Sequence, residues 1–283
     1  MQARQPEIFD DRYELLELLG GGQTTSVHRA RRLADGQEVA LKILDPTLTT
    51  NPQALGRFRR EIEAGRLLKH PTLIRLLDTG VTPEGACYMV VELLKGDTLR
   101  QLLDRERRLQ PGRVQRIATQ LTNGLVEAHG HAIIHRDLKP DNIFVAAGDQ
   151  VKVIDFGLVR FTDADPSDRR LTRRGMSLGS IQYLAPEAVD ATRADTRSDL
   201  YSLGIILYEC LTGEHPIPAT NIVNFLHMHQ THVPTSLHGH PSAPDCPPAL
   251  ASLVMSLLSK DPADRPQSAR AVLATLVADQ DFF

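Results

Sequence analysis

The run HRDLKPDN at residues 135–142, followed by DFG at residues 155–157, decides how this sequence folds. Two short apolar segments, Ile143–Val145 and Val151–Ile154, lie between the runs and flank a Gly148-Asp149 pair. Apolar segments on both sides of a glycine-containing turn predict a β-hairpin. A hairpin here brings the polar side chains before and after it to neighbouring strand ends.

Those side chains are of the kinds that metal-assisted group transfer needs. Asp155 and Asn142 offer hard oxygen ligands, which Mg²⁺ prefers. Asp137 can orient an incoming hydroxyl and take its proton. Each residue alone is as readily explained as a loop cap, but their order and spacing together indicate catalysis.

The residues before these runs predict a small antiparallel sheet. Strands are expected at Tyr13–Leu19, Val27–Leu33 and Glu38–Leu44, with an Asp35-Gly36 hairpin signal before the last.

An amphipathic helix is expected after these strands. Leu55, Phe58, Ile62 and Gly65 recur at helical spacing. The helix should end near residues 69–71, and two further strands are expected at residues 73–78 and 86–92.

Lys42 stands at the end of the third expected strand among apolar neighbours. Because a lone buried ammonium is costly, it needs a partner, and Glu61 on the flank of the helix's apolar stripe can supply one. Such a pair would hold the ammonium where it can bind phosphate oxygens. Taken alone, a surface lysine and a surface glutamate would be the better explanation of both residues.

Gly20-Gly21-Gly22 ends the first strand, where glycines let backbone N–H groups approach phosphates closely. Glycine turns are common, so this signal is weak by itself. No Gly-Lys-Ser/Thr follows, which excludes a Walker-type loop.

The second part of the chain has a helical pattern. Helices are expected at Thr98–Leu103 and Val114–His131, and again from Arg197 onward apart from a proline-rich break at Pro234–Pro248. The polar stretch Thr162–Ser177 has no apolar period and is expected to be a loop.

Composition narrows the class of protein. The 283 residues, 41 % of them hydrophobic, suffice for one large domain or two packed lobes. A net charge of −3 gives no sign of nucleic-acid or anionic-membrane binding. Cys87, Cys210 and Cys246 are too few and too scattered for a disulfide framework. No membrane span and no signal peptide is visible, so a cytoplasmic location is expected.

From Tyr13 to Val277 the chain resembles the eukaryotic-type (Hanks-type) Ser/Thr protein kinases, in particular their bacterial branch. The resemblance implies an α+β, bilobal protein-kinase fold, in which a small antiparallel sheet lobe with one main helix precedes a larger, mainly helical lobe. The implied limits are a tail at 1–12, the small lobe at 13–92, a hinge at 93–97, the large lobe at 98–277 with an activation segment at 155–187, and a tail at 278–283.

The resemblance also assigns roles to residues. Catalysis falls to Asp137, Lys139 and Lys42, and Asn142 with Asp155 would hold Mg²⁺, with Mn²⁺ as an alternative. The implied ATP-binding residues are Leu19, Gly20, Gly22, Val27, Ala40, Lys42, Glu61, Val91, Glu92, Leu94, Asp97, Asn142 and Asp155. The third glycine of the family's phosphate loop is replaced here by Thr25.

Three structural contacts follow from the same resemblance. Glu187 of Ala185-Pro186-Glu187 would pair with Arg265. Asp199 would brace the backbone of residues 135–137, and Ser180 would contact Lys139.

The implied activity is transfer of the γ-phosphoryl group of ATP to serine or threonine hydroxyls of proteins, with autophosphorylation of the activation loop. Thr172 is the favoured loop site and Ser177 the next, ahead of Thr162 and Ser167, with Arg136 as the phosphate receptor. A homodimer through the small lobe is an analogy with bacterial relatives. A pseudokinase or ATP-binding scaffold, and a small-molecule kinase of similar fold, are the alternatives.

Two features depart from a simple interpretation. Gly65 stands where relatives place an apolar side chain against Phe156. A glycine there suggests a gap and a loosely held helix, in which case Gly65→Leu should raise the basal activity. The alternative is a glycine that simply allows the helix to pack closely. Five histidines between residues 227 and 240 could form a metal site, but no cysteines or carboxylates match them, so ordinary histidines are expected.

Overall fold

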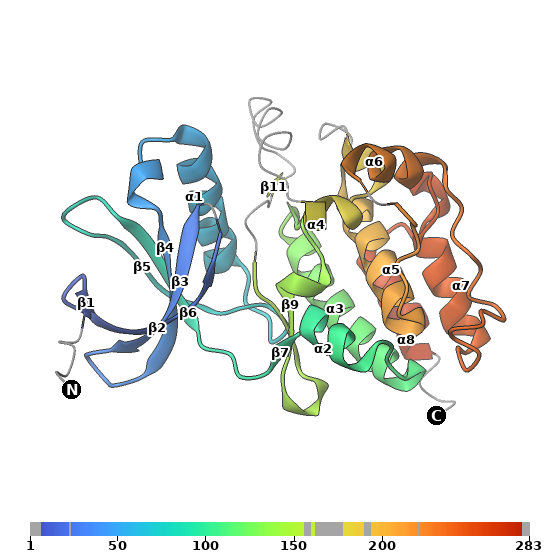
Figure 1. Ribbon diagram of the computed structural model, residues 1–283, viewed down its shortest axis with the longest axis horizontal. Helices are drawn as coiled ribbons and strands as arrows, with labels where there is room; N and C mark the ends of the chain where they lie inside the picture. Colours follow the sequence, from blue (N-terminus) through green and yellow to red (C-terminus); the bar gives the residue numbers. More distant parts are fainter. Residues whose placement is uncertain are drawn as a thin grey trace. The chain divides into compact units, whose positions relative to one another are not determined.

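The computed structural model describes residues 7–22, 24–155, 160–161, 178–189, 194–219 and 221–278 (Figure 1). The chain divides into two compact units. The small unit comprises Met1–Lys69 and Ile74–Lys95, and the large unit comprises His70–Leu73 and Gly96–Phe283.

The small unit is an antiparallel sheet with one long helix. Its sheet has six strands in the order β1-β2-β3-β4-β6-β5. The strands are β1 (Glu7–Phe9), β2 (Tyr13–Gly21), β3 (Thr25–Arg32), β4 (Glu38–Leu44), β5 (Leu76–Val81) and β6 (Cys87–Glu92), and the helix is α1 (Pro52–Leu67).

The two faces of β4 explain how this unit is assembled. Val39, Leu41 and Ile43 alternate along the strand and join the core on one face of the sheet. Leu44 points to the other face, where it packs with Phe58 of α1. Lys42 lies two residues before Leu44 and therefore belongs to the face that α1 covers.

Helix α1 begins with clear sequence signals. The side chain of Asn51 accepts hydrogen bonds from the backbone N–H groups of Gln53 and Ala54, and Pro52 takes the first helical position. Phe58, which is buried, then anchors the helix to the sheet.

The strand limits differ from the expected ones at two places. β1 lies within the stretch that was expected to be a tail, since Phe9 pairs with Tyr13 across a tight turn. β5 begins at Leu76 because the residues before it bind elsewhere: Thr72 O accepts the N–H of Val153 at 2.8 Å, and Leu73 forms a bridge with the same residue.

The large unit is mainly helical. Its helices are α2 (Leu99–Glu106), α3 (Pro111–Gly130), α4 (Leu178–Gln182), α5 (Thr196–Thr212), α6 (Ile222–Thr231), α7 (Pro248–Leu257) and α8 (Ala269–Ala278). Its short strands are β7 (Asp97–Thr98), β9 (Ile143–Val145) and β10 (Val151–Val153), which form one sheet, and β8 (Ile133–Ile134) and β11 (Arg160–Phe161), which pair with each other.

Helix α5 is the centre of the large unit, with α3, α7 and α8 packed against it (Figure 1). Every residue from Ser198 to Thr212 is buried, which explains a sequence that is apolar nearly all round. Asp195 caps its N-terminus, and Gly213 ends it in the left-handed conformation with φ of 74°.

The expected α+β class, a small sheet unit with one main helix and a larger helical unit, is confirmed. Within the ranges that the structure describes, no helix combines the length and apolarity that crossing a bilayer requires.

The close approach of α5 to α7 yields a test of the packing. A Cβ atom on Gly204 would lie 2.8 Å from Leu257 Cβ and 3.3 Å from its carbonyl carbon, and neither atom can rotate away. We expect Gly204→Ala to lower the free energy of unfolding by about 1–2 kcal/mol, because overpacking outweighs the better helix propensity of alanine. Thermal melting measures this.

Gly130→Ala is the matched control, because a Cβ there meets nothing within 4 Å. We expect it to melt at or above the unaltered protein. A Gly204→Ala protein that melts no lower than the control would contradict the packing argument.

Candidate active site

One carboxylate binds the backbone of the loop at residues 135–142. Asp199 of α5 accepts the backbone N–H of His135 and of Arg136, each at 2.9 Å, through its two oxygens. His129 Nε2, at the end of α3, lies 2.9 Å from Asp199 Oδ2. Burial alone would raise the pKa of Asp199, but these hydrogen bonds outweigh it and lower that pKa.

The backbone that Asp199 binds includes one residue in an unfavourable conformation. Arg136 has φ of 64°, a conformation that side-chain-bearing residues rarely adopt. The two hydrogen bonds to Asp199 hold the backbone in that conformation directly before Asp137.

Asp137 is the centre of a polar cluster in the large unit. Asn142 Nδ2 donates to Asp137 O at 2.8 Å and to its Oδ2 at 3.0 Å. Lys139 Nζ lies 3.2 Å from the same Oδ2 and donates to Ser180 Oγ at 3.0 Å. Asp137 Oδ1 is buried without a hydrogen-bond partner among the described residues. One oxygen of this carboxylate is therefore fixed, and the other is left for a further ligand.

Asn142 and Asp155 are also brought near each other. The N–H of Ile154, directly before Asp155, donates to Asn142 O at 3.0 Å. Because the Asn142 amide nitrogen is turned to Asp137, its Oδ1 is the atom left to meet a cation. The hairpin of β9 and β10 that joins these residues has the expected register, with Val145 opposite Val151.

In the small unit, Lys42 pairs with Glu61. Lys42 Nζ lies 2.6 Å from Glu61 Oε1, and the two side chains are 16 % and 7 % exposed. Such low exposure shows that the pair is shielded from solvent, which a surface lysine and glutamate would not be. Lys42 is placed by the register of β4, opposite Val27 on β3 and Met89 on β6.

The glycine turn lies at the end of β2. Gly20 pairs with Val27, and a Cβ added at Gly20 or Gly22 would meet nothing within 4 Å. Gly21 is the glycine that the fold itself requires, since a Cβ there would lie 2.8 Å from Thr25 O. Gly20 and Gly22 are exposed, while the Gly22 N–H donates to Thr25 O at 2.9 Å and so closes the turn.

The other expected ATP-binding residues of the small unit lie along the same strands. Ala40 is buried and pairs with half-buried Val91, while Leu19 is exposed. Glu92 uses its side chain within the unit, since its Oε1 accepts the N–H of Arg75 at 2.8 Å. Leu94 follows β6 and is half-buried.

Asp97, in the large unit, is already paired. Its Oδ2 lies 2.6 Å from Arg105 Nη1, with both side chains largely exposed. A ribose contact by Asp97 therefore competes with this ion pair.

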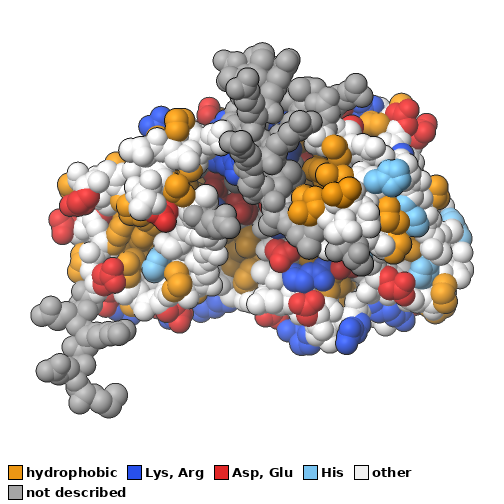
Figure 2. Space-filling view, turned by 45° about the horizontal axis from the view of Figure 1, so that its top comes forward, with side chains coloured by type: hydrophobic (Ala, Val, Ile, Leu, Met, Phe, Trp, Pro, Cys, Tyr) orange, Lys and Arg blue, Asp and Glu red, His pale blue; other side chains and the backbone are white. Residues whose placement is uncertain are grey.

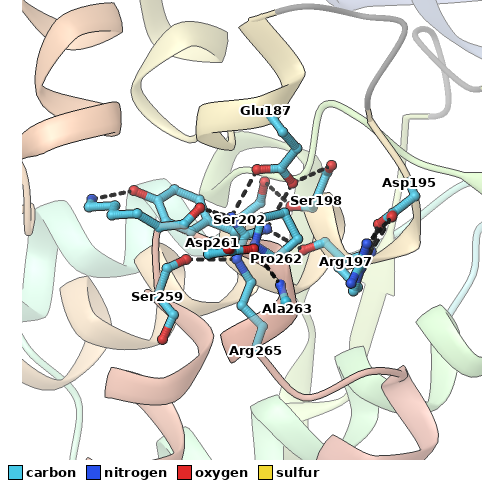
Figure 3. Close-up of polar contacts among 12 residues, drawn as sticks. Glu187, Asp195, Arg197, Ser198, Ser202, Ser259, Asp261, Pro262, Ala263 and Arg265 are labelled. Atoms are coloured by element: carbon cyan, nitrogen blue, oxygen red, sulfur yellow. Dashed lines mark hydrogen bonds and ion pairs between the residues drawn. The ribbon is translucent and has the colours of Figure 1, made fainter.

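A second buried ion pair fixes the segment after Ser180. Arg265 Nη1 and Nη2 donate to the two oxygens of Glu187 at 2.7 Å and 2.8 Å. The three remaining N–H groups of the guanidinium bind the carbonyl oxygens of Arg197, Ser259 and Lys260 (Figure 3). All five donors are used, and the Arg265 side chain is fully buried.

The region also contains a polar cluster that the sequence did not signal. Glu209 of α5 accepts from Tyr183 OH at 2.6 Å and from Arg100 Nη2 at 2.6 Å. None of the three has a motif of its own, and neither does His129. Their roles depend on contacts that sequence spacing does not show.

Several predictions fall outside the described residues. Phe156, Gly157 and all four loop hydroxyls, Thr162, Ser167, Thr172 and Ser177, lie there. The expected activation-loop phosphate site therefore stays a prediction.

The histidines between residues 227 and 240 do not converge. His229 and His240 are buried and hydrogen-bonded to tyrosines, while Figure 2 shows other histidines in pale blue scattered over the surface of this unit. Among the described residues no group of three or more metal-binding side chains is arranged to hold an ion.

Comparison with known sequences decides the family. The profile of the protein kinase domain matches residues 13–277, which is nearly the whole chain. The chain belongs to the protein kinase family.

Bacterial kinases are among the proteins that this chain resembles. The chain is 40 % identical to the serine/threonine-protein kinase pkn3 of Myxococcus xanthus over 271 residues, covering 94 % of this chain and 50 % of the relative. It is 38 % identical to PknB of Mycolicibacterium smegmatis over 277 residues, covering 96 % and 43 %. The chain thus spans half or less of the length of these relatives.

Gly65 does not leave the expected gap in this kinase domain. A Cβ added there would lie 3.2 Å from Leu76 Cβ and 3.4 Å from its Cδ2. The space beside α1 is therefore filled by Leu76 of β5, and the glycine permits close packing of helix on strand. Arg66, the next residue, binds Thr79 of β5 at 2.9 Å.

This packing reverses the expected effect of substitution. Gly65→Ala should push α1 away from β5 and weaken the Lys42–Glu61 pair, because Leu76 Cβ is fixed to the backbone. We expect kcat/KM for ATP to fall about 3–10-fold. Steady-state peptide phosphorylation measures it.

Gly56→Ala on the same helix is the control, since its Cβ meets nothing within 4 Å. It should stabilise the helix and leave the kinetics unchanged. Indistinguishable kinetics for the two variants would show that close packing at residue 65 does not govern the pair.

The buried histidines predict a pH dependence of stability. Burial lowers the pKa of His229 to about 3, against 6.5 for an exposed imidazole, and it lowers the pKa of His215 too. The unfolded chain therefore binds more protons below pH 6.5, so stability is complete above that value and is lost as the pH falls.

We expect the free energy of unfolding to decrease between pH 6.5 and 4.5, with a slope approaching about 1.4 kcal/mol per pH unit for each such histidine. Urea unfolding at several pH values measures the slope. His229→Gln should reduce it, and a slope that does not change in this variant would contradict the assignment to His229.

Proposed function

We propose that this kinase domain transfers the γ-phosphoryl group of ATP to serine or threonine hydroxyls of proteins. The observation that carries the proposal is the cluster around Asp137, in which one carboxylate oxygen is fixed by Asn142 and Lys139 and the other is buried with no hydrogen-bond partner in the described part of the chain. A buried carboxylate oxygen with no donor suits an incoming hydroxyl group.

In this proposal Asp137 is the catalytic base. Its Oδ1 orients the substrate hydroxyl and accepts its proton as the oxygen attacks the phosphorus atom. Lys139 lies beside Oδ2 and stabilises the negative charge of the transferred group. Ser180 keeps the lysine ammonium in place.

The protein kinase family in general uses ATP and a divalent metal ion. Here Asn142 Oδ1 and the Asp155 carboxylate are the oxygen donors that fit such an ion, and we propose Mg²⁺, with Mn²⁺ as an alternative. When bound, the ion neutralises phosphate charge. Asn142 would serve the site twice, since its amide nitrogen positions Asp137 and its oxygen would be available to hold the ion.

The small unit supplies the remaining nucleotide contacts in the proposal. Lys42, held by Glu61, binds phosphate oxygens, and the exposed glycine turn at Gly20 and Gly22 covers the phosphates. Apolar contacts to the adenine come from Leu19, Val27, Ala40 and Val91, hinge contacts come from the backbone of Glu92 and Leu94, and a ribose contact comes from Asp97.

Two features support protein hydroxyls as substrates. Lys139 is typical of Ser/Thr kinases, and the bacterial relatives carry serine/threonine-protein kinase as their name. The long segment between Asp155 and Glu187 is where a protein substrate and a regulatory phosphate would bind, with Thr172 and then Ser177 as the proposed autophosphorylation sites. A cytoplasmic location, where ATP is available, and a homodimer through the small unit are further proposals.

Asp137→Asn tests the proposed activity directly. The change keeps the shape of the side chain but removes the base, so we expect label transfer from ATP in the presence of Mg²⁺ to fall at least 100-fold, while ATP binding changes little. Asp141→Asn, an exposed carboxylate in the same run, is the control and should stay active.

Phosphosite mapping on the same samples distinguishes the alternatives. Label on Thr172 or other protein hydroxyls, in the active proteins only, supports the proposal. ATP binding without label in any sample would instead favour a pseudokinase, and label on added metabolites but not on peptides would favour a small-molecule kinase.

A further inference from the structure

Two histidines bind consecutive carbonyl groups of the segment that carries Ser180. His229 Nε2 lies 3.0 Å from Ile181 O, and His215 Nε2 lies 3.1 Å from Gln182 O. His229 belongs to α6, whereas His215 stands in the loop after α5. The segment is therefore bound at adjacent residues from two independent elements.

The residues on both sides of these carbonyls are also held. Ser180 Oγ accepts from Lys139 Nζ at 3.0 Å, and Tyr183 O accepts from Ser202 Oγ at 2.7 Å. All four residues from 180 to 183 thus make a contact with a side chain outside the segment. The two histidine contacts lie in the middle of this row.

The contacts restrict the hydrogen positions of the two imidazoles. A carbonyl oxygen only accepts a hydrogen bond, so the Nε2 atom of each ring must carry a hydrogen and donate it. Tyr201 OH lies 3.3 Å from His229 Nδ1, which completes the hydrogen bonds of His229 as the neutral form with hydrogen on Nε2. His215 Nδ1 lies 3.1 Å from the N–H and 3.0 Å from the carbonyl oxygen of Ile217.

The surroundings keep the rings neutral and in place. His229 is fully buried, and burial lowers the pKa of both histidines. Phe225 lies between them, with ring centroids 5.6 Å from His215 and 6.1 Å from His229. The ammonium of Lys260 lies against the Tyr201 ring, and after burial and the neighbouring His215 its positive charge further lowers the pKa of His229.

We propose that His215 and His229 are positioning residues that fix Ser180, and through it Lys139, for phosphoryl transfer. The inference rests on the proposed kinase function. Ser180 directly precedes Ile181, so a displacement of the two carbonyls moves the Ser180 hydroxyl relative to the lysine ammonium. Lys139 would then lose the contact that holds it beside Asp137.

Substitutions that remove or keep the donor test this role. His229→Leu and His215→Leu remove the N–H group, and each should lower kcat for peptide phosphorylation about five-fold, the order expected for one neutral hydrogen bond. KM for ATP should stay within two-fold. Glutamine carries an amide nitrogen at a similar reach, so His229→Gln and His215→Gln should recover most of kcat.

His240→Leu is the matched control. His240 is also buried and bonded to a tyrosine, Tyr208, with Nε2 3.1 Å from its hydroxyl, but within the described residues its side chain has no hydrogen bond to residues 180–183. We expect this variant to melt at a lower temperature while keeping kcat. If His240→Leu lowers kcat as much as His229→Leu and His215→Leu do, the loss reflects general destabilisation of the fold. That result would overturn the inference.

A double-mutant cycle examines the route through Ser180. In a Ser180→Ala background the leucine substitutions should have little further effect on kcat, because the contact they support is already gone. Full additivity would overturn the inference.

Hydrogen exchange separates failure of this inference from failure of the proposed function. The Leu184 amide donates to Ile181 O at 3.2 Å, so it should exchange faster in His229→Leu than in the unaltered protein and in His240→Leu. An unaltered protein that transfers no phosphoryl group overturns the kinase proposal, and the positioning role with it. Unchanged exchange at Leu184 overturns the positioning role alone.

Discussion

The carboxylate of Asp199 is the constraint on which the polar cluster depends. It is 1 % exposed, and a buried charge of this kind is tolerated only when it is fully hydrogen-bonded. Its partners are two backbone N–H groups of the loop and the imidazole of His129. Since Asp199 stands on a helix that is buried all round, the loop takes its position from the core of the large unit.

The same constraint explains why Asp137 is set so firmly. Arg136 is held in an unfavourable backbone conformation, and the free energy for this comes from the bonds to Asp199. Asn142 and Lys139 then fix one oxygen of Asp137 from the other side. A base that is held before its substrate arrives loses little entropy when the substrate binds.

Much of this arrangement could be predicted from sequence, for a physical reason. The sheet strands, α1 and the β9–β10 hairpin arise from local periodicity and turn residues, and both can be recognised in a single sequence. Lys42 and Glu61 could be paired because a charge on a buried strand demands a partner. The motif order around Asp137 then placed the cluster in the large unit.

The features that were missed depend on tertiary contacts. β5 starts late because Thr72 and Leu73 bind Val153, and the space beside Gly65 is decided by how Leu76 packs. His215 and His229 belong to no motif, because a hydrogen bond to a backbone carbonyl group requires no particular spacing of residues in the sequence.

The Glu187–Arg265 pair has a consequence for how the protein is made. The two residues are 78 positions apart, and the guanidinium is completely buried. Chains are synthesised from the N-terminus, so Glu187 leaves the ribosome long before its partner exists. The end of the segment that carries Ser180 can reach its final place only when almost the whole domain has been translated, and until then the newly made chain has a carboxylate that must stay in water.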